Sequence, residues 1–221
     1  MNKTTCCIFI LLLNGCSVLD SQNIAPGYNQ AYKAIKNAIV GYENEFITSE
    51  LVQQIPYASS LIRIGRGPYG LMILESKDQT RGTWVSADGA YFVINKGKII
   101  QTKGLLNNVS YLLTPHSFNK LDLLNIPENE VYKYYYSFDF PQLSNLEVTA
   151  KYSIKEKKKI KLLNQEKELT LIHEELKNNY IGWNVLNKYW VDEDSFVWKS
   201  EQHISPKLPV IMYEVTKKPS N

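Results

Sequence analysis

The stretch of sequence that decides the fold is residues 57–103, YASSLIRIGRGPYGLMILESKDQTRGTWVSADGAYFVINKGKIIQTK. β-Branched and aromatic residues dominate it, and turn-forming groups such as Arg-Gly-Pro, Lys-Asp, Asp-Gly and Lys-Gly interrupt it at short intervals. The pattern predicts about four or five short strands joined by tight turns. No combination of residues in this stretch indicates catalysis.

Residues 65–70, GRGPYG, match the dinucleotide-binding pattern G-x-G-x-x-G. That site requires a helix to begin at the glycines, because the helix N-terminus binds the pyrophosphate. Residues 71–74, LMIL, are strand-like instead, and Pro68 among the glycines favours a hairpin turn. We therefore expect a turn here and no nucleotide site.

Length and composition are those of an ordinary globular protein. The 221 residues suffice for one all-β domain or two small ones. The formal net charge of +3 is too small to indicate a nucleic-acid partner.

Residues 1–16, MNKTTCCIFILLLNGC, have the layout of a secretory signal and contain all three cysteines. The apolar run is too short for a membrane-spanning helix, which needs about 20 residues. Its end, Leu-Asn-Gly-Cys, is similar to the bacterial lipobox, in which the cysteine sulfur receives a diacylglyceryl group. We therefore expect a signal peptide at 1–15 and lipidation, including acyl chains such as palmitate, at Cys16. A non-lipidated secretory signal is the alternative.

The residues after the signal predict a tether and then helices. Ser17, rather than Asp, follows the cysteine, which favours the outer membrane as the destination. Residues 16–29 show no periodicity and read as a lipidated tether. Residues 30–54 carry an apolar stripe at helical spacing, and Thr48 or Ser49 can cap a short second helix that Pro56 stops. We expect these helices to pack on the sheet, with a position on the membrane surface as the alternative.

The second half of the chain also predicts strands. Residues 131–140, VYKYYYSFDF, are so aromatic that both faces of the strand must be covered, or one must meet a partner, and Tyr134–Tyr136 are a candidate partner contact. Residues 146–177 alternate in polarity, with turns expected at Lys-Glu-Lys-Lys (155–158) and Asn-Gln-Glu-Lys (164–167). Residues 104–108, GLLNN, are expected to form a loop, and the mixed region after them, to Asn129, shows no assignable pattern.

One basic cluster is a candidate site for a polyanion, such as an acidic polysaccharide or a lipid phosphate. Glutamates lie close by in sequence, so a solvated hairpin tip is the alternative. The cluster consists of Lys155, Lys157, Lys158, Lys159 and Lys161.

Other motifs for chemistry are weak, so we predict no catalytic residue, no metal site and no cofactor. His116, His173 and His203 lie far apart in sequence, and residues 192–194, Asp-Glu-Asp, lack the rest of a calcium loop. No G-x-S-x-G nucleophile motif occurs, although carboxylates paired only in space remain an alternative. The four tryptophans are expected in the core, with sugar stacking as the alternative. They are Trp84, Trp183, Trp190 and Trp198.

Three segments together carry a family resemblance. They are residues 56–68, PYASSLIRIGRGP; residues 83–105, TWVSADGAYFVINKGKIIQTKGL; and residues 187–219, NKYWVDEDSFVWKSEQHISPKLPVIMYEVTKKP. With the lipobox, they make the chain resemble the YjbF/GfcB family of group 4 capsule lipoproteins. The Lys-rich residues 112–177 depart from the family pattern.

The resemblance implies a lipoprotein anchored in the outer membrane and facing the periplasm. It also implies a non-enzymatic accessory role in capsule or exopolysaccharide secretion, beside an outer-membrane β-barrel protein and other capsule-export proteins. A polysaccharide- or lipid-binding module is the alternative hypothesis, and a periplasmic glycan hydrolase is the third hypothesis. No family residue except Cys16 has a function to carry over.

The expected fold is all-β with N-terminal helices. Roughly a dozen antiparallel strands should form one large barrel-like or sandwich domain, residues 30–221, in which residues 57–103 and 131–216 are two halves of one sheet system.

Overall fold

The computed structural model describes residues 47–115, 122–127, 130–163 and 165–219. These residues belong to a compact unit, Tyr42–Asn221. The predicted signal peptide, Cys16, the tether and the first predicted helix lie outside the described residues.

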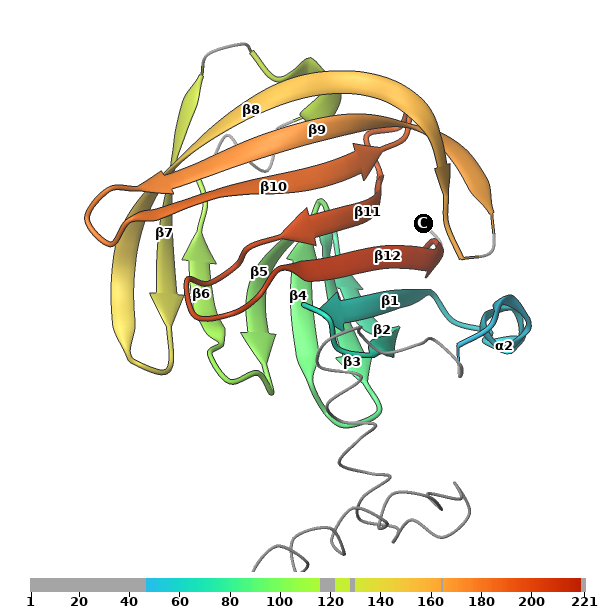
Figure 1. The fold of residues 1–221 in the computed structure, drawn as a ribbon. Coiled ribbons are helices and arrows are strands. Elements are labelled where there is room, and N and C mark those ends of the chain that lie inside the picture. The colour runs from blue at the N-terminus through green and yellow to red at the C-terminus, as the bar shows by residue number, and fades with distance from the viewer. Residues whose placement is uncertain (1–46, 116–121, 128–129, 164, 220–221) are drawn as a thin grey trace, which may run out of the picture. The chain divides into compact units, whose positions relative to one another are not determined.

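Twelve antiparallel strands form one sheet in the order β5-β4-β3-β2-β1-β12-β11-β10-β9-β8-β7-β6 (Figure 1). This confirms the expected all-β fold of roughly a dozen strands. The strands are β1 (Ser59–Ile64), β2 (Tyr69–Asp78), β3 (Arg81–Ser86), β4 (Tyr91–Asn95), β5 (Lys98–Lys103), β6 (Val109–Leu113), β7 (Val131–Phe138), β8 (Leu143–Lys161), β9 (Glu166–Asn178), β10 (Trp183–Val191), β11 (Val197–Gln202) and β12 (Ile211–Lys217).

Two meanders make up this sheet, and β1 joins them by pairing with β12. The meander β1–β5 coincides with the stretch in which about four or five strands were predicted, and β6–β12 form the second half. The two halves therefore belong to one sheet system, as expected.

Side chains, rather than a backbone ladder, link the two sheet edges, β5 and β6. Thr102 Oγ1 on β5 accepts a hydrogen bond from the backbone N–H of Val109 on β6 at 3.0 Å. In the connecting loop, Asn108 Oδ1 accepts from the N–H of Leu105 at 3.0 Å, and Asn108 Nδ2 donates to the Leu105 carbonyl at 3.1 Å. The sheet is thus a nearly closed barrel, which leaves little edge exposed.

The short helix α2 (Ser49–Gln54) precedes the barrel. Thr48 caps it by accepting a hydrogen bond from the Leu51 N–H, and Val52 is its buried residue. Ser49 Oγ donates to the Leu163 carbonyl in the β8–β9 turn at 2.9 Å, and Lys217 Nζ donates to the Ile55 carbonyl at 2.8 Å. The predicted second helix and its cap are confirmed, and these two bonds tie the helix to the β8–β9 turn and to the end of β12.

The first four residues of the G-x-G-x-x-G segment form the β1–β2 turn, as predicted, and its last two begin β2. Gly65 has a φ of +56°, and a Cβ on it would lie 2.9 Å from Pro209 Cβ. The Gly67 N–H donates to the Ile64 carbonyl, which closes a turn where a nucleotide site would need a helix.

Strands β8 and β9 form a long hairpin that arches over the neighbouring strands (Figure 1). The turn expected at residues 155–158 is wrong: β8 continues as one strand to Lys161, and the register shifts between Ile154 and Lys157 as in a β-bulge. The prediction failed because charged side chains on an exposed strand have the same composition as a turn. The tip returns to the barrel, where Glu214 Oε1 accepts a hydrogen bond from the Leu163 N–H at 2.6 Å.

The aromatic strand β7 alternates between the interior and the outer face. Tyr132, Tyr134, Tyr136 and Phe138 are buried, while Tyr135 on the outer face donates to Glu147 Oε2 at 3.2 Å. Because side chains alternate between the two faces of a strand, covering the inner face is enough to bury most of the aromatic run. Tyr134 and Tyr136 are at most 1% exposed, so the prediction that they contact a partner is wrong.

The barrel interior holds one hydrophobic core, and all four tryptophans belong to it as expected. Trp183 packs edge-on against Tyr136, with ring centroids 5.3 Å apart. The region without an assignable pattern contributes β6 and the 3₁₀ turn η2 (Leu123–Asn125), which buries Leu123.

Candidate functional site

A cavity of about 610 Å³ lies at one end of the barrel. Its walls come from the β2–β3 turn, the β4–β5 turn, the β10–β11 turn and the chain end after β12. These connections lie far apart in sequence and reach the same end because their strands are antiparallel. The volume lies within the roughly 300–1,000 Å³ typical of small-ligand sites.

The floor of this mouth cavity is apolar and aromatic. Trp84 of β3 and Tyr213 of β12 meet edge-on there, with ring centroids 6.0 Å apart and planes at 74°. Leu74, Ile94 and Val197 complete the floor. Burial raises the pKa of Tyr213 far above its ordinary value, so its hydroxyl stays neutral.

The rim of the mouth cavity is positively charged. Lys77, Arg81, Lys96 and Lys218 line it, against the single carboxylate of Asp194. Lys218 Nζ lies 3.9 Å from Asp194 Oδ2, 4.0 Å from Asp192 Oδ2 and 4.6 Å from the centre of the Phe196 ring. Within the described ranges, no hydrogen bond or ion pair engages the Arg81 guanidinium, which is exposed.

Residues 192–194 form a structural turn beside this rim, as predicted. Asp192 Oδ1 accepts from the backbone N–H groups of Asp194 and Phe196, and Asp192 Oδ2 accepts from Trp198 Nε1 at 2.7 Å. These bonds use the Asp192 carboxylate to hold the β10–β11 connection. The part of the chain that the structure describes contains no group of three or more metal-ligating side chains.

The β4–β5 turn forms one wall of the mouth cavity through Lys96 and Gly97. Gly97 has a φ of +81°, and a Cβ on it would lie 2.4 Å from Val197 Cβ, so this contact requires glycine. Gln202 Nε2 donates to the Gly97 carbonyl at 2.7 Å, and Gln202 Oε1 accepts from the Ile99 N–H at 3.0 Å. The turn therefore carries Lys96 on the cavity lining and is followed by the buried Lys98 at the start of β5.

Behind this turn, Lys98 and Glu174 form a buried ion pair. Lys98 Nζ lies 2.5 Å from Glu174 Oε1, and the two side chains are 3% and 0% exposed. Tyr152 donates to the same oxygen at 2.5 Å, while Tyr189 and Asn187 donate to Oε2 at 2.7 and 2.9 Å. The carboxylate thus has four partners, which is how a buried charge is tolerated.

Burial alone would raise the pKa of Glu174, but the Lys98 ammonium and the Tyr152 and Asn187 hydrogen bonds together hold it below its ordinary value. Burial lowers the pKa of Lys98, and Glu174 opposes that shift. Burial also raises the pKa of Tyr152 and Tyr189 well above the ordinary value. Because these side chains are all buried, this network is a structural element of the interior.

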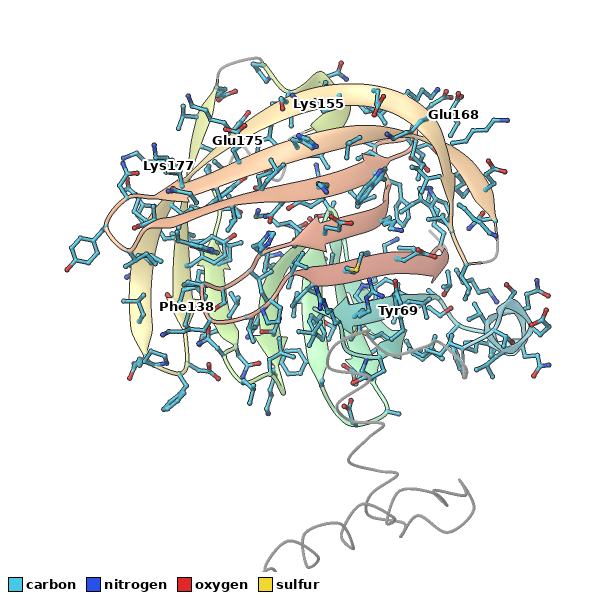
Figure 2. The ribbon with its side chains drawn as sticks, in the orientation of Figure 1. Tyr69, Phe138, Lys155, Glu168, Glu175 and Lys177 are labelled. Carbon is cyan, nitrogen blue, oxygen red and sulfur yellow. The ribbon has the colours of Figure 1, made fainter. Side chains whose placement is uncertain are left out.

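The predicted basic cluster lies on the exposed distal part of β8, and none of its lysines lines the mouth cavity, although Lys157 pairs with Glu193 in the β10–β11 connection that forms one cavity wall. Glutamates from two other segments pair with one of its lysines: Lys157 Nζ lies 2.8 Å from Glu193 Oε1 and 3.4 Å from Glu168 Oε2. Figure 2 shows Lys155 and Glu168 along this hairpin. The cluster's role as a polyanion site stays a prediction.

Of the other predicted positions, Cys16 and His116 lie outside the described residues. His173 is on β9, and His203 follows β11, where its backbone N–H donates to Asn187 Oδ1 at 2.7 Å. Burial lowers the pKa of both imidazoles. Neither histidine lines the mouth cavity.

Sequence reasoning missed the Lys98–Glu174 pair and the mouth cavity. A signal for the pair existed, because alternation along β9 puts Glu174 on the same face as the buried Ile172 and Leu176. An acidic residue at an inward position predicts a buried partner. The cavity has no comparable local signal, because separate turns assemble it.

Comparisons with known proteins agree with this fold. An Escherichia coli K12 protein described as uncharacterized lipoprotein YjbF is 19% identical over 92% of this chain and 92% of its own length. Uncharacterized lipoprotein GfcB from the same organism is 26% identical over 46% of this chain and 44% of its length. The crystal structure of the hypothetical E. coli lipoprotein YmcC shares the fold, with a TM-score of 0.70 and 17% identity over 80% of this chain and 92% of that one.

A family model matches most of the chain. Its description is group 4 capsule polysaccharide lipoprotein gfcB, YjbF, and the match covers residues 32–215, which include every strand of the barrel except the last two residues of β12. The resemblance inferred from the three sequence segments is therefore confirmed. The chain belongs to the YjbF family of group 4 capsule polysaccharide lipoproteins.

Proposed function

We propose that this protein is a non-enzymatic accessory in capsule or exopolysaccharide secretion, held at the periplasmic face of the outer membrane by acyl chains on Cys16. Its partners would be an outer-membrane β-barrel protein and other capsule-export proteins. The observation that carries the proposal is the capsule-lipoprotein family match over residues 32–215, together with the lipobox that ends at Cys16. Two or three acyl chains hold a protein firmly on a membrane.

The buried chemistry of the barrel supports a role without catalysis. The carboxylate of Glu174 is 0% exposed and hydrogen-bonded to its neighbours, so it is poorly placed to meet a substrate. The other buried carboxylate among the described residues, Glu214, accepts from the Leu163 N–H and faces Lys199 at 3.6 Å. Both carboxylates therefore have a structural role in the barrel.

A candidate contact for a protein partner lies at the barrel end opposite the mouth cavity. Leu106, Phe140 and Tyr180 sit in the β5–β6, β7–β8 and β9–β10 connections and are 90%, 74% and 93% exposed. Asn108 Nδ2 donates to Asp139 Oδ2 at 2.7 Å, which ties the first two connections together. Large apolar side chains on such tips are typical of interaction sites.

The test is polysaccharide export in cells that lack the chromosomal gene and carry one variant each. Wild type should restore export, whereas Cys16→Ala and the triple variant Leu106→Ser, Phe140→Ser, Tyr180→Ser should reduce it. A matched control replaces Tyr57 and Tyr111, which are also exposed but lie outside these three connections. It should export normally.

Immunoblots must show equal amounts of every variant. Deletion with no effect on exported polysaccharide would contradict the proposed function. Normal export by the triple variant would contradict the partner surface alone.

A further inference from the structure

The mouth cavity combines an apolar floor with a cationic rim, and this combination selects the chemistry of a ligand. Trp84 and Tyr213 form the floor. Four cationic side chains and the carboxylate of Asp194 line the rim, and Lys218 also pairs with Asp192 just outside it, so positive charge still predominates. A ligand that matches both must be anionic at one position and apolar over another surface. The exposed Lys77 and Arg81 show that the rim is open to solvent.

We propose that the mouth cavity binds an anionic saccharide whose charge is carried by a carboxylate or a phosphate. A pyranose ring has apolar C–H faces and polar hydroxyl edges, which suits a site that changes from aromatic floor to charged rim within one cavity. An acyl chain would need apolar walls along its full length. The saccharide as ligand rests on the proposed function, while the anion requirement rests on the rim charges.

Arg81 is the main specificity-determining residue of this site. It is the first residue of β3, and its register partners are Asp78 on β2 and Asn95 on β4, so the sheet fixes its backbone. A guanidinium presents a planar fork of donors that fits a carboxylate or a phosphate with two hydrogen bonds. Lys96 and Lys218 add positive charge from the neighbouring connections.

The experiment is isothermal titration of the full-length protein, purified from membranes in mild detergent. The probes are a trimer of galacturonic acid, the neutral trimer maltotriose, and glucose 6-phosphate. Binding of the uronate trimer or the phosphosugar, weakened by salt, supports the proposal, and the two probes identify the anion. Failure of both to bind, or equal binding of maltotriose, overturns it.

Two variants locate the site. Arg81→Glu should weaken binding by about tenfold or more, because a charge-assisted hydrogen bond is lost and repulsion replaces it. The matched control is Lys155→Glu with Lys159→Glu, which reverses exposed charges on β8 outside the cavity. It should bind as wild type does. Unchanged binding by Arg81→Glu, or loss confined to the β8 control, overturns the cavity assignment.

Thermal unfolding of Arg81→Glu must match wild type, which the exposed position favours. Absence of saccharide binding would leave the export phenotype of the deletion strain untouched. Failure of this inference is therefore distinguishable from failure of the proposed function.

Discussion

The buried Lys98–Glu174 pair offers the sharpest quantitative test of the barrel interior. The perturbations are Lys98→Met, Glu174→Gln and the double variant. Each single variant leaves one charged group inside the barrel without its ionic partner, because the two side chains are 3% and 0% exposed. Breaking a buried pair from one side typically costs about 3–5 kcal/mol.

The magnitude follows from the geometry of the pair. At the separation of 2.5 Å between Lys98 Nζ and Glu174 Oε1, the attraction is about 7 kcal/mol for an effective dielectric constant of about 20. Desolvation of both ions offsets much of that attraction. Against a total stability of about 5–15 kcal/mol, either single variant removes a large share. The midpoint of thermal unfolding should fall by roughly 6–20 °C.

The assay is thermal and urea unfolding of wild type and the three variants, followed by circular dichroism. The double variant should lose clearly less stability than the sum of the two single losses, because it leaves no unpaired buried charge. Lys133→Met with Glu147→Gln is the control, since that pair is 60% and 46% exposed at 3.0 Å. It should change stability by about 1 kcal/mol or less. Additive losses at Lys98 and Glu174 would refute the reasoning.

Three further outcomes are expected. The pKa of Glu174 lies below its unfolded value of 4.5, so the stabilisation by its carboxylate is present above about pH 4.5 and is lost as the pH falls through the folded pKa. In acid unfolding, Glu174→Gln should therefore lose less stability between roughly pH 5 and 3 than wild type does. An identical loss would contradict this prediction. Gly97→Ala should destabilise the barrel by about 2–4 kcal/mol in urea unfolding, because the added Cβ meets Val197 and φ is positive, whereas Gly89→Ala, with a positive φ and open space, should cost less. Thr102→Val should lower the free energy of unfolding by about 1–3 kcal/mol, because the Val109 N–H loses its acceptor between β5 and β6. Hydrogen exchange at the Val109 amide should become faster. Unchanged exchange would argue against an edge contact held by side chains.

Local patterns explain how much of the fold the sequence predicts. The strands β1–β5 follow from β-formers interrupted by turn residues, and the α2 cap follows from Thr48, because these features depend on neighbours in sequence. The turn wrongly predicted at residues 155–158 also came from a local sequence pattern. Lysines and a glutamate on an exposed strand have the composition of a turn, and only pairing with β9 distinguishes the two.

The candidate site was beyond the sequence because its parts are distant. Arg81, Lys96 and Lys218 reach one rim only after β1 pairs with β12 and brings the two meanders together. That pairing depends on register between strands about 150 residues apart, which no local pattern contains. The predicted basic cluster could be recognised because its lysines lie within seven residues of one another, and the structure places none of them in the lining of the cavity.

The most direct test of the accessory role is affinity purification of the full-length protein from its own membranes in mild detergent, with mass spectrometry of what accompanies it. Cys16→Ala, carried out in parallel, controls for membrane anchoring. We expect an outer-membrane β-barrel protein to co-purify with wild type and to be reduced or lost with Cys16→Ala. A protein that is lipidated and isolated alone would contradict the accessory role.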